Sequence, residues 1–135
     1  MNVVDSSGWL EYFADGPNAG FYEKAIRDVE HLVVPTLSLF EVFKRIVQQR
    51  SEGEALQAVA AMQQGELVEL TVPLALDSAR LSLSEKIPMA DSIMLATARA
   101  HGATLWTQDA DFKNVAGVKY IPRKWLPLVT SSRNE

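Results

Sequence analysis

The chain contains no cysteine among its 135 residues. Disulfide bonds, thiolate catalysis and zinc sites built from cysteine are therefore excluded. Only two histidines are present, His31 before a predicted strand and His101 at the end of a predicted helix. Both lie outside the acidic motifs described below. We interpret them as surface or capping residues, and we do not expect catalysis based on histidine.

Long apolar runs and targeting signals are also missing. No run approaches the roughly 18 apolar residues that a membrane-spanning helix needs. The first residues, MNVVDSS, lack the basic stretch followed by an apolar stretch that marks a secretory signal. The six prolines and seven glycines are scattered, so no linker or low-complexity segment is indicated. We therefore expect a soluble, cytoplasmic protein with no membrane partner.

The length and composition are typical of one globular domain. Hydrophobic residues make up 47% and charged residues 22% of the chain. We predict a single domain over residues 1–130 and a frayed tail at 131–135. The net charge of −4 argues against a nucleic-acid partner when taken alone. Several of the acids group in one candidate site, however, so the total charge does not decide this question.

Short apolar runs alternate with helical patterns along the chain. The expected strands cover residues 2–5, 32–34, 67–72, 103–107 and 118–121. The expected helices cover residues 9–13, 18–30, 38–51, 52–64, 73–84 and 89–100. Apolar strands separated by helices indicate a mostly parallel sheet that is covered on both faces. The predicted fold class is therefore a three-layer α/β/α domain.

Four acidic residues from separate segments are expected at one edge of this sheet. Asp5 ends the first strand, and Asp109 follows the strand 103–107. Glu41 lies near the start of the helix after the second strand, and Asp91 opens the helix 89–100. Ligands of open parallel sheets bind beyond the carboxyl ends of the strands. Carboxylates that meet there repel each other unless a cation joins them, and Mg²⁺ or Mn²⁺ is the natural counter-charge.

Each acid also has a purely structural interpretation. Ser38 and Glu41 match the S-x-x-E capping box, which explains the glutamate without chemistry. Asp91 suits the first turn of a helix because of the helix dipole. Asp109 and Asp111 are typical turn residues. Independent caps and turns have no reason to meet at one edge, so a shared location favours a common site.

The motifs that carry these acids resemble the PIN-domain family, in particular the VapC-type toxins of toxin–antitoxin pairs. The matching segments are VVDSS (3–7), SLFEVFKR (38–45), MADSIMLATA (89–98) and LWTQDADF (105–112). They extend over nearly the whole chain in the order and spacing of the family. The resemblance implies a PIN-like fold and an endoribonuclease that depends on Mg²⁺ or Mn²⁺ and leaves 5′-phosphate and 3′-hydroxyl ends. It also implies a cognate antitoxin and a homodimer.

The resemblance further implies roles for individual residues. The acidic quartet that binds the metal and supports catalysis would be Asp5, Glu41, Asp91 and Asp109, with the metal held chiefly by Asp5, Asp91 and Asp109. The supporting residues would be Ser7 and Thr107, through their hydroxyls, and Asp111, unless Asp111 shares or replaces the role of Asp109. Basic residues near these motifs are candidates for RNA binding, namely Lys44, Arg45, Lys86 and Lys113.

Other functions place different demands on the same residues. A phosphatase of the haloacid-dehalogenase type needs a second aspartate two residues after the first, where this chain has Ser7. A response-regulator receiver needs paired acids near the amino terminus and a late lysine after a strand, and neither is visible. A catalytically inactive PIN-like module that only binds RNA or protein remains an alternative, although such modules usually lose acids. The aromatic cluster within residues 9–13 and the helix pair 38–64 are candidate core or partner surfaces.

Overall fold

The computed structural model describes residues 1–124. Five strands lie in this range, β1 (Asn2–Val4), β2 (Leu32–Pro35), β3 (Glu66–Val68), β4 (Thr104–Thr107) and β5 (Val118–Tyr120). The α-helices of the same range are α1 (Ser6–Phe13), α2 (Ala19–Arg27), α3 (Thr36–Gln49), α4 (Glu52–Met62), α5 (Val72–Glu85) and α6 (Met89–Ala100). Two short 3-10 helices are η1 (Val29–His31) and η2 (Ala110–Phe112). The predicted order of strands and helices is confirmed. The predicted frayed tail at 131–135 lies outside the described residues.

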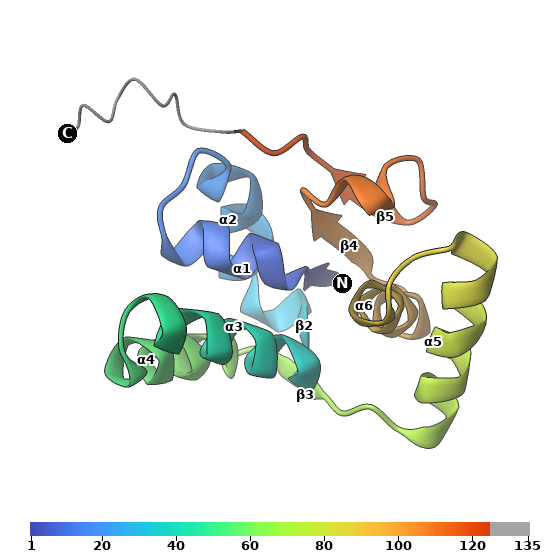
Figure 1. Cartoon of the computed structure of the whole chain (residues 1–135), viewed down its shortest axis with the longest axis horizontal. Helices are drawn as coiled ribbons and strands as arrows, with labels where there is room; N and C mark the ends of the chain where they lie inside the picture. Colours follow the sequence, from blue (N-terminus) through green and yellow to red (C-terminus); the bar gives the residue numbers. More distant parts are fainter. Residues whose placement is uncertain (125–135) are drawn as a thin grey trace.

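The five strands form one parallel sheet in the order β3-β2-β1-β4-β5 (Figure 1). The chain builds outward from β1 through β2 to β3, then crosses back to β4 and β5 on the other side of β1. The strand order therefore reverses between β1 and β4. In parallel α/β sheets a crevice opens at such a reversal, beyond the carboxyl ends of the two strands. The topology alone therefore indicates a candidate ligand site at this edge of the sheet.

Both faces of the sheet are covered, as the fold prediction requires. Successive residues of β1 point to opposite faces, so Val4 packs with α1, α2, α3 and α4, while Val3 packs with α6 and η2. Trp9 is fully buried on the first face, and Tyr12 and Phe13 pack against the same core while partly buried, which confirms core packing for the aromatic cluster. The predicted three-layer α/β/α fold is therefore confirmed. Within residues 1–124, no helix is both long and apolar enough to cross a membrane.

Strand β3 is shorter than the predicted strand 67–72. It ends at Val68, and Thr71 already caps α5, because its Oγ1 accepts a hydrogen bond of 3.3 Å from the backbone N–H of Leu74. The alternation of apolar and polar residues over this range resembled a strand. The helix-start signal of Thr71 and Pro73 prevailed over this strand pattern. Pro73 suits the first turn of a helix and has no backbone N–H to donate to a sheet.

The capping-box interpretation of Glu41 is wrong. Helix α3 begins at Thr36, so Ser38 lies inside the helix rather than at its end. The Ser38 side chain is fully buried, and its hydroxyl donates to the Met94 sulfur at 3.4 Å. Glu41 consequently lies in the second turn of α3. A carboxylate at that position needs a different explanation.

The side chain of Asn18 links two distant parts of the chain. Asn18 precedes α2, but its side chain makes no cap bond to that helix. Its Nδ2 instead donates to Gln108 Oε1 at 2.9 Å and to the carbonyl oxygen of Pro122 at 3.1 Å. Asn18 therefore ties the start of α2 to the segments that follow β4 and β5.

Candidate functional site

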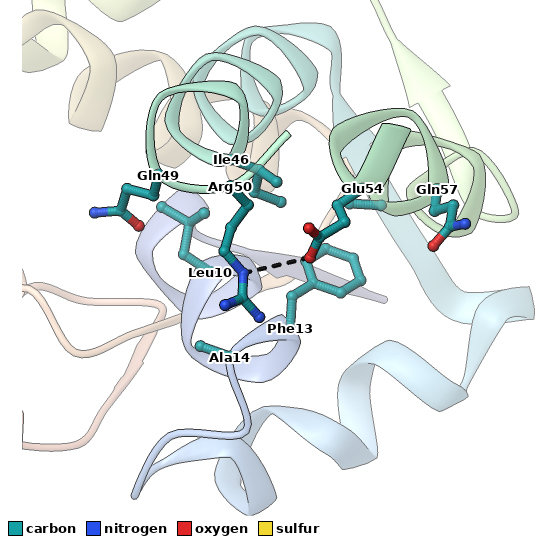
Figure 2. Close-up of a pocket in the computed structure, with 9 residues that line it drawn as sticks. Leu10, Phe13, Ala14, Ile46, Gln49, Arg50, Glu54 and Gln57 are labelled. Carbon is teal, nitrogen blue, oxygen red and sulfur yellow. Dashed lines mark ion pairs between the residues drawn. The ribbon is translucent and has the colours of Figure 1, made fainter. Parts of the chain in front are cut away.

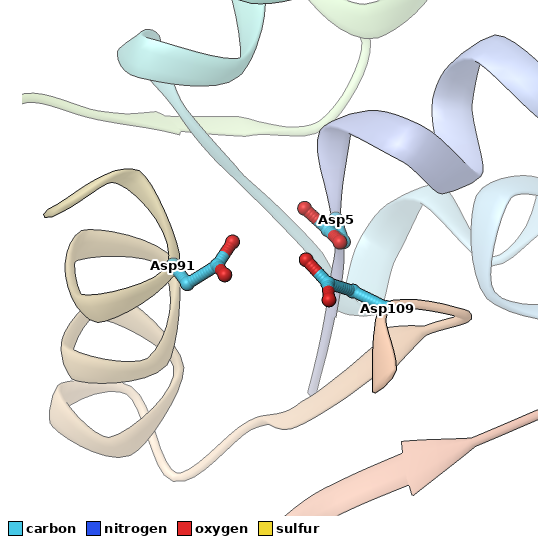
Figure 3. A group of neighbouring side chains, drawn as sticks. All are labelled: Asp5, Asp91 and Asp109. Carbon is cyan, nitrogen blue, oxygen red and sulfur yellow. The ribbon is translucent and has the colours of Figure 1, made fainter. Parts of the chain in front are cut away.

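Three aspartates from distant parts of the chain meet at the reversal of strand order (Figure 3). Asp5 follows β1, Asp109 follows β4, and Asp91 lies in the first turn of α6. One carboxylate oxygen from each residue lies within 4.8 Å of those of the other two. The fold therefore brings together the three residues that the sequence pointed to as metal ligands.

Asp5 is held by two hydroxyl groups that donate to the same oxygen. Thr107 Oγ1 donates to Asp5 Oδ2 at 2.8 Å, and Ser7 Oγ donates to it at 3.1 Å. The Thr107 hydroxyl also accepts a hydrogen bond of 2.9 Å from the backbone N–H of Asp109. Asp5 is only 5% exposed and Thr107 is fully buried. One threonine therefore fixes the relative positions of two of the three acids.

Burial and neighbouring negative charge raise the pKa values of Asp5 and Asp91. Burial raises the pKa of Asp5, an effect that the negative charge of Asp109 reinforces and the hydroxyl hydrogen bonds of Thr107 and Ser7 oppose. Burial, followed by the charges of Asp109 and Asp5, raises the pKa of Asp91 to about 8. The site therefore carries excess negative charge that a proton or a cation must offset.

Replacing Thr107 by Val should lower the free energy of unfolding by about 1–3 kcal/mol, because the Asp5 carboxylate and the Asp109 N–H both lose a buried partner. The matched control is Thr97→Val, since Thr97 is equally buried but its hydroxyl donates to the helix carbonyl of Ile93. Urea unfolding of both variants measures the difference. Equal losses in the two variants would mean that the Thr107 contacts stabilise nothing beyond packing.

Glu41 does not join the three aspartates within the described part of the chain. Its Oε1 accepts a hydrogen bond of 2.6 Å from Ser6 Oγ. Ser6 directly follows Asp5, so Glu41 lies beside the group without sharing its close spacing. Ser6 is not among the site residues predicted from the sequence. Its adjacency to Asp5 was visible, but its partner depends on how closely α1 and α3 approach.

The remaining predicted residues lie around this centre. The Asp111 side chain is exposed, whereas its backbone N–H donates to Asp109 Oδ1 at 2.9 Å. The four basic candidates are all exposed, namely Lys44, Arg45, Lys86 and Lys113. Among residues 1–124, no ion pair joins Arg45 to Glu41.

His31 is exposed beside Asp28, and His101 caps the end of α6, where its Nδ1 contacts the carbonyl oxygen of Thr97.

The donor set suits a hard divalent cation. It consists of three carboxylates, and within residues 1–122 no lysine, arginine or histidine forms an ion pair with any of them. Oxygen ligands of this kind are those that Mg²⁺ and Mn²⁺ prefer. The hydroxyl contacts to Asp5 would orient its carboxylate for such an ion. The residues present therefore fit a metal site.

Fold and site together define the class of protein. It is a parallel α/β/α domain with an acidic cluster where the strand order reverses. The family model described as PIN domain matches residues 3–118, so the chain belongs to the PIN-domain family. The predicted resemblance is thereby confirmed. A search by sequence against curated proteins gives no match.

Solved structures agree with this assignment at the level of the fold. A toxin–antitoxin complex from Klebsiella pneumoniae matches with a TM-score of 0.75 and 21% identity, covering 88% of this chain and 96% of that one. VapBC bound to DNA from Salmonella typhimurium matches with a TM-score of 0.71 and 14% identity, covering 90% and 97%. The sarcin–ricin loop cleaving toxin VapC20 of Mycobacterium tuberculosis matches with a TM-score of 0.71 and 15% identity, covering 86% and 95%.

Proposed function

We propose that the chain is a metal-dependent endoribonuclease and the toxin of a toxin–antitoxin pair. The observation that carries the proposal is the meeting of Asp5, Asp91 and Asp109 within 4.8 Å at the strand-order reversal. Membership of the PIN-domain family and the likeness to toxin structures support the same conclusion. The proposed cofactor is Mg²⁺ or Mn²⁺, and the proposed substrate is RNA.

The residues of the site would divide the work. Asp5 and Asp91 would be the principal metal ligands, while Asp109 and Glu41 would hold the metal directly or through water and would orient the attacking water. A bound divalent ion supplies a lowered pKa for that water and offsets charge on the phosphoryl oxygens. Ser7 and Thr107 keep the Asp5 carboxylate in place through their hydrogen bonds. No side-chain nucleophile is needed, because the attacking group in this proposal is water.

The direct test is incubation of the purified chain with structured RNA, including a sarcin–ricin-loop RNA, in Mg²⁺ or Mn²⁺. Cleavage should depend on the metal, stop in EDTA, resume when metal is restored, and leave 5′-phosphate ends. Cleavage that persists in EDTA would contradict the proposal. An Asp5→Asn preparation, purified in parallel, controls for contaminating nucleases. Absence of cleavage on many RNAs, with metal binding intact, would favour the inactive binding module instead.

Exposed basic side chains near the acidic site are proposed to hold the RNA backbone. Arg45 lies one turn beyond Glu41 on α3 and is exposed. Arg45→Ala should weaken RNA binding and reduce the slope of log affinity against log salt by about 0.7, the value for one lost contact to single-stranded RNA. Fluorescence anisotropy at several salt concentrations measures both quantities.

The matched control for this variant is Arg27→Ala. Arg27 is also exposed, but it lies at the end of α2 that leads toward the start of β2, at the opposite edge of the sheet, and it pairs with Glu23 at 2.9 Å. Its replacement should leave the salt slope unchanged. An unchanged slope in Arg45→Ala as well would remove Arg45 from the RNA-binding surface.

The antitoxin is proposed to bind a cleft between α1 and the helix pair α3–α4 (Figure 2). The cleft encloses about 500 Å³, with Leu10, Phe13 and Ile46 as its apolar lining. Its rim carries the ion pair between Arg50 Nε and Glu54 Oε1 at 3.3 Å. An apolar floor with a polar rim suits an amphipathic peptide segment. This cleft joins the aromatic cluster and the helix pair that the sequence indicated as partner surfaces.

Placing a bulky charge in this cleft should block the antitoxin. Ala14 is exposed and lines the cleft, so Ala14→Arg is expected to reduce co-purification with the product of an adjacent antitoxin gene by at least roughly tenfold. Ala60→Arg, on an exposed part of α4 outside the cleft lining, is the control. Equal co-purification of both variants would place the antitoxin elsewhere.

The proposal also covers the extent of the domain and its place in the cell. Residues 1–130 would form a single PIN-like domain acting in the cytoplasm, with no membrane partner. The phosphatase alternative gains no support, because the family match is to PIN domains and Ser7 occupies the position of the second aspartate.

A further inference from the structure

One buried amide side chain joins three segments of the chain next to the acidic site. Asn18 is 2% exposed, and its Nδ2 donates to Gln108 Oε1 at 2.9 Å and to the carbonyl oxygen of Pro122 at 3.1 Å. Gln108 is equally buried and lies between Thr107 and Asp109 in the chain. The two bonds use both N–H groups of the Asn18 amide. A hydroxyl could donate only one of them and a carboxylate neither, so this position requires an amide.

Asn18 is itself held in place by α1. Its backbone N–H donates to Glu11 Oε2 at 2.7 Å, and Glu11 belongs to this helix. Helix α1 begins directly after Asp5. Thr107 provides a second link to the same place, because its Oγ1 donates to Asp5. The segment after β4 is therefore fixed relative to Asp5 along two routes, one through Thr107 and the other through Asn18 and α1.

Stability alone does not account for two buried amides at this place. Burying a polar side chain is unfavourable unless its polar atoms find partners. Asn18 Oδ1 and Gln108 Nε2 are buried, and neither has a hydrogen-bond partner within residues 1–122. Two apolar side chains of similar size would bury no unpaired polar atom. The pair is therefore better explained by where it holds the chain than by what it contributes to folding.

Asp109 is the acid of the site that most needs such a hold. Asp91 lies within α6, and Asp5 is buried between β1 and α1. Asp109 is less buried and precedes only the short 3-10 helix η2. Its carboxylate nevertheless has to stay within 4.8 Å of the other two ligand atoms (Figure 3). Metal ligands need neighbours that fix their orientation, since small displacements weaken the site.

We propose that Asn18 is a positioning residue for Asp109. By holding Gln108, it keeps the Asp109 carboxylate at the spacing that a shared metal ion requires. Asn18 acts through the chain at Gln108 and does not itself bind the metal. The consequence for metal binding rests on the proposed metal site, whereas the hold on the segment after β4 does not.

Amide hydrogen exchange in the metal-free chain tests the hold directly. Asn18→Leu removes both donated bonds and keeps a side chain of similar size. Exchange of the Asp109 N–H, which donates to Thr107 Oγ1 at 2.9 Å, should become at least roughly tenfold faster. The Asp5 N–H donates to the carbonyl oxygen of Trp106 at 3.0 Å and serves as the internal reference. A merely structural role would show mainly at the Asp5 N–H, because core amides exchange through global opening.

Metal affinity tests the consequence for the site. Asn18→Leu and Gln108→Met, which removes the other end of the bond at similar side-chain length, should each weaken Mn²⁺ binding by roughly tenfold. In an Asp109→Asn background, Asn18→Leu should weaken binding no further, because it acts through Asp109. The matched control is Ser78→Ala, since Ser78 is 4% exposed and its hydroxyl donates to the carbonyl oxygen of Leu74 within α5. This variant should bind Mn²⁺ as the wild type does.

Unchanged exchange at Asp109 in the folded variants would overturn the proposal. Faster exchange at Asp109 with Mn²⁺ affinity fully retained would overturn it as well. If the wild-type chain binds no Mn²⁺, the proposed metal site fails, and exchange at Asp109 then decides the role of Asn18 by itself. Circular dichroism melts show which variants are folded at the assay temperature. Asn18→Leu and Gln108→Met alter opposite ends of one bond, so either variant alone suffices for the test.

Discussion

Replacing Asp5 by Asn should abolish RNA cleavage, with a loss of roughly 1,000-fold or more in kcat/KM. The amide keeps an oxygen that can accept the hydrogen bonds of Ser7 and Thr107, so the fold around it is preserved. It removes, however, the negative charge that the metal needs. Single-turnover cleavage of a defined RNA measures the loss.

The control for Asp5→Asn is Asp111→Asn. Asp111 is exposed, and it contacts the site through its backbone N–H, which the substitution retains. This variant should keep activity within about tenfold of the wild type, because the substitution removes only a negative charge near the metal site and no metal ligand. Full activity in Asp5→Asn would remove the central residue from the mechanism.

The second large effect concerns the stability of the metal-free protein at alkaline pH. The pKa of Asp91 rises from 3.8 to about 8 in the folded state, chiefly because of burial. The folded chain thus holds a proton that the unfolded chain releases above pH 4. By linkage, stability falls as the pH rises from about 4 to about 8, and the full penalty is present above that range.

Asp91→Asn removes this penalty. In EDTA at pH 9 the variant should melt roughly 3–8 °C above the wild type, a range that allows for solvent screening of a partly exposed group. Near pH 4 the difference should vanish. Asp77→Asn, at an exposed residue paired with Arg80, is the control and should show no gain. A lower Tm for Asp91→Asn at pH 9 would show that the carboxylates are not in conflict.

Much of the fold followed from the alternation of apolar runs and helical patterns. The meeting of Asp5 and Asp109 was also predictable, because parallel strands present their carboxyl ends at one edge. The sequence pattern failed where two local signals competed. At residues 69–71 an alternating pattern suggested a strand, but the helix start at Thr71 and Pro73 prevailed.

Other features depend on packing that no local pattern encodes. Ser38 looked like a helix cap, yet α3 begins earlier and buries it against Met94. The contact between Ser6 and Glu41 requires α1 and α3 to lie side by side. The period of α5 was visible, but which side would remain uncovered depends on where α6 packs. The exposure of Leu76 and Leu83 on α5 therefore emerged only from the structure.

Titration with Mn²⁺, followed by electron paramagnetic resonance, measures whether the three aspartates form one metal site. Metal-free wild-type chain should bind Mn²⁺ and reduce the free-ion signal. Asp5→Asn, Asp91→Asn and Asp109→Asn should each weaken binding by at least roughly tenfold, whereas Asp111→Asn should bind as the wild type does. Binding that survives in all three aspartate variants, or that is lost only in Asp111→Asn, would mean that the three aspartates do not form a metal site.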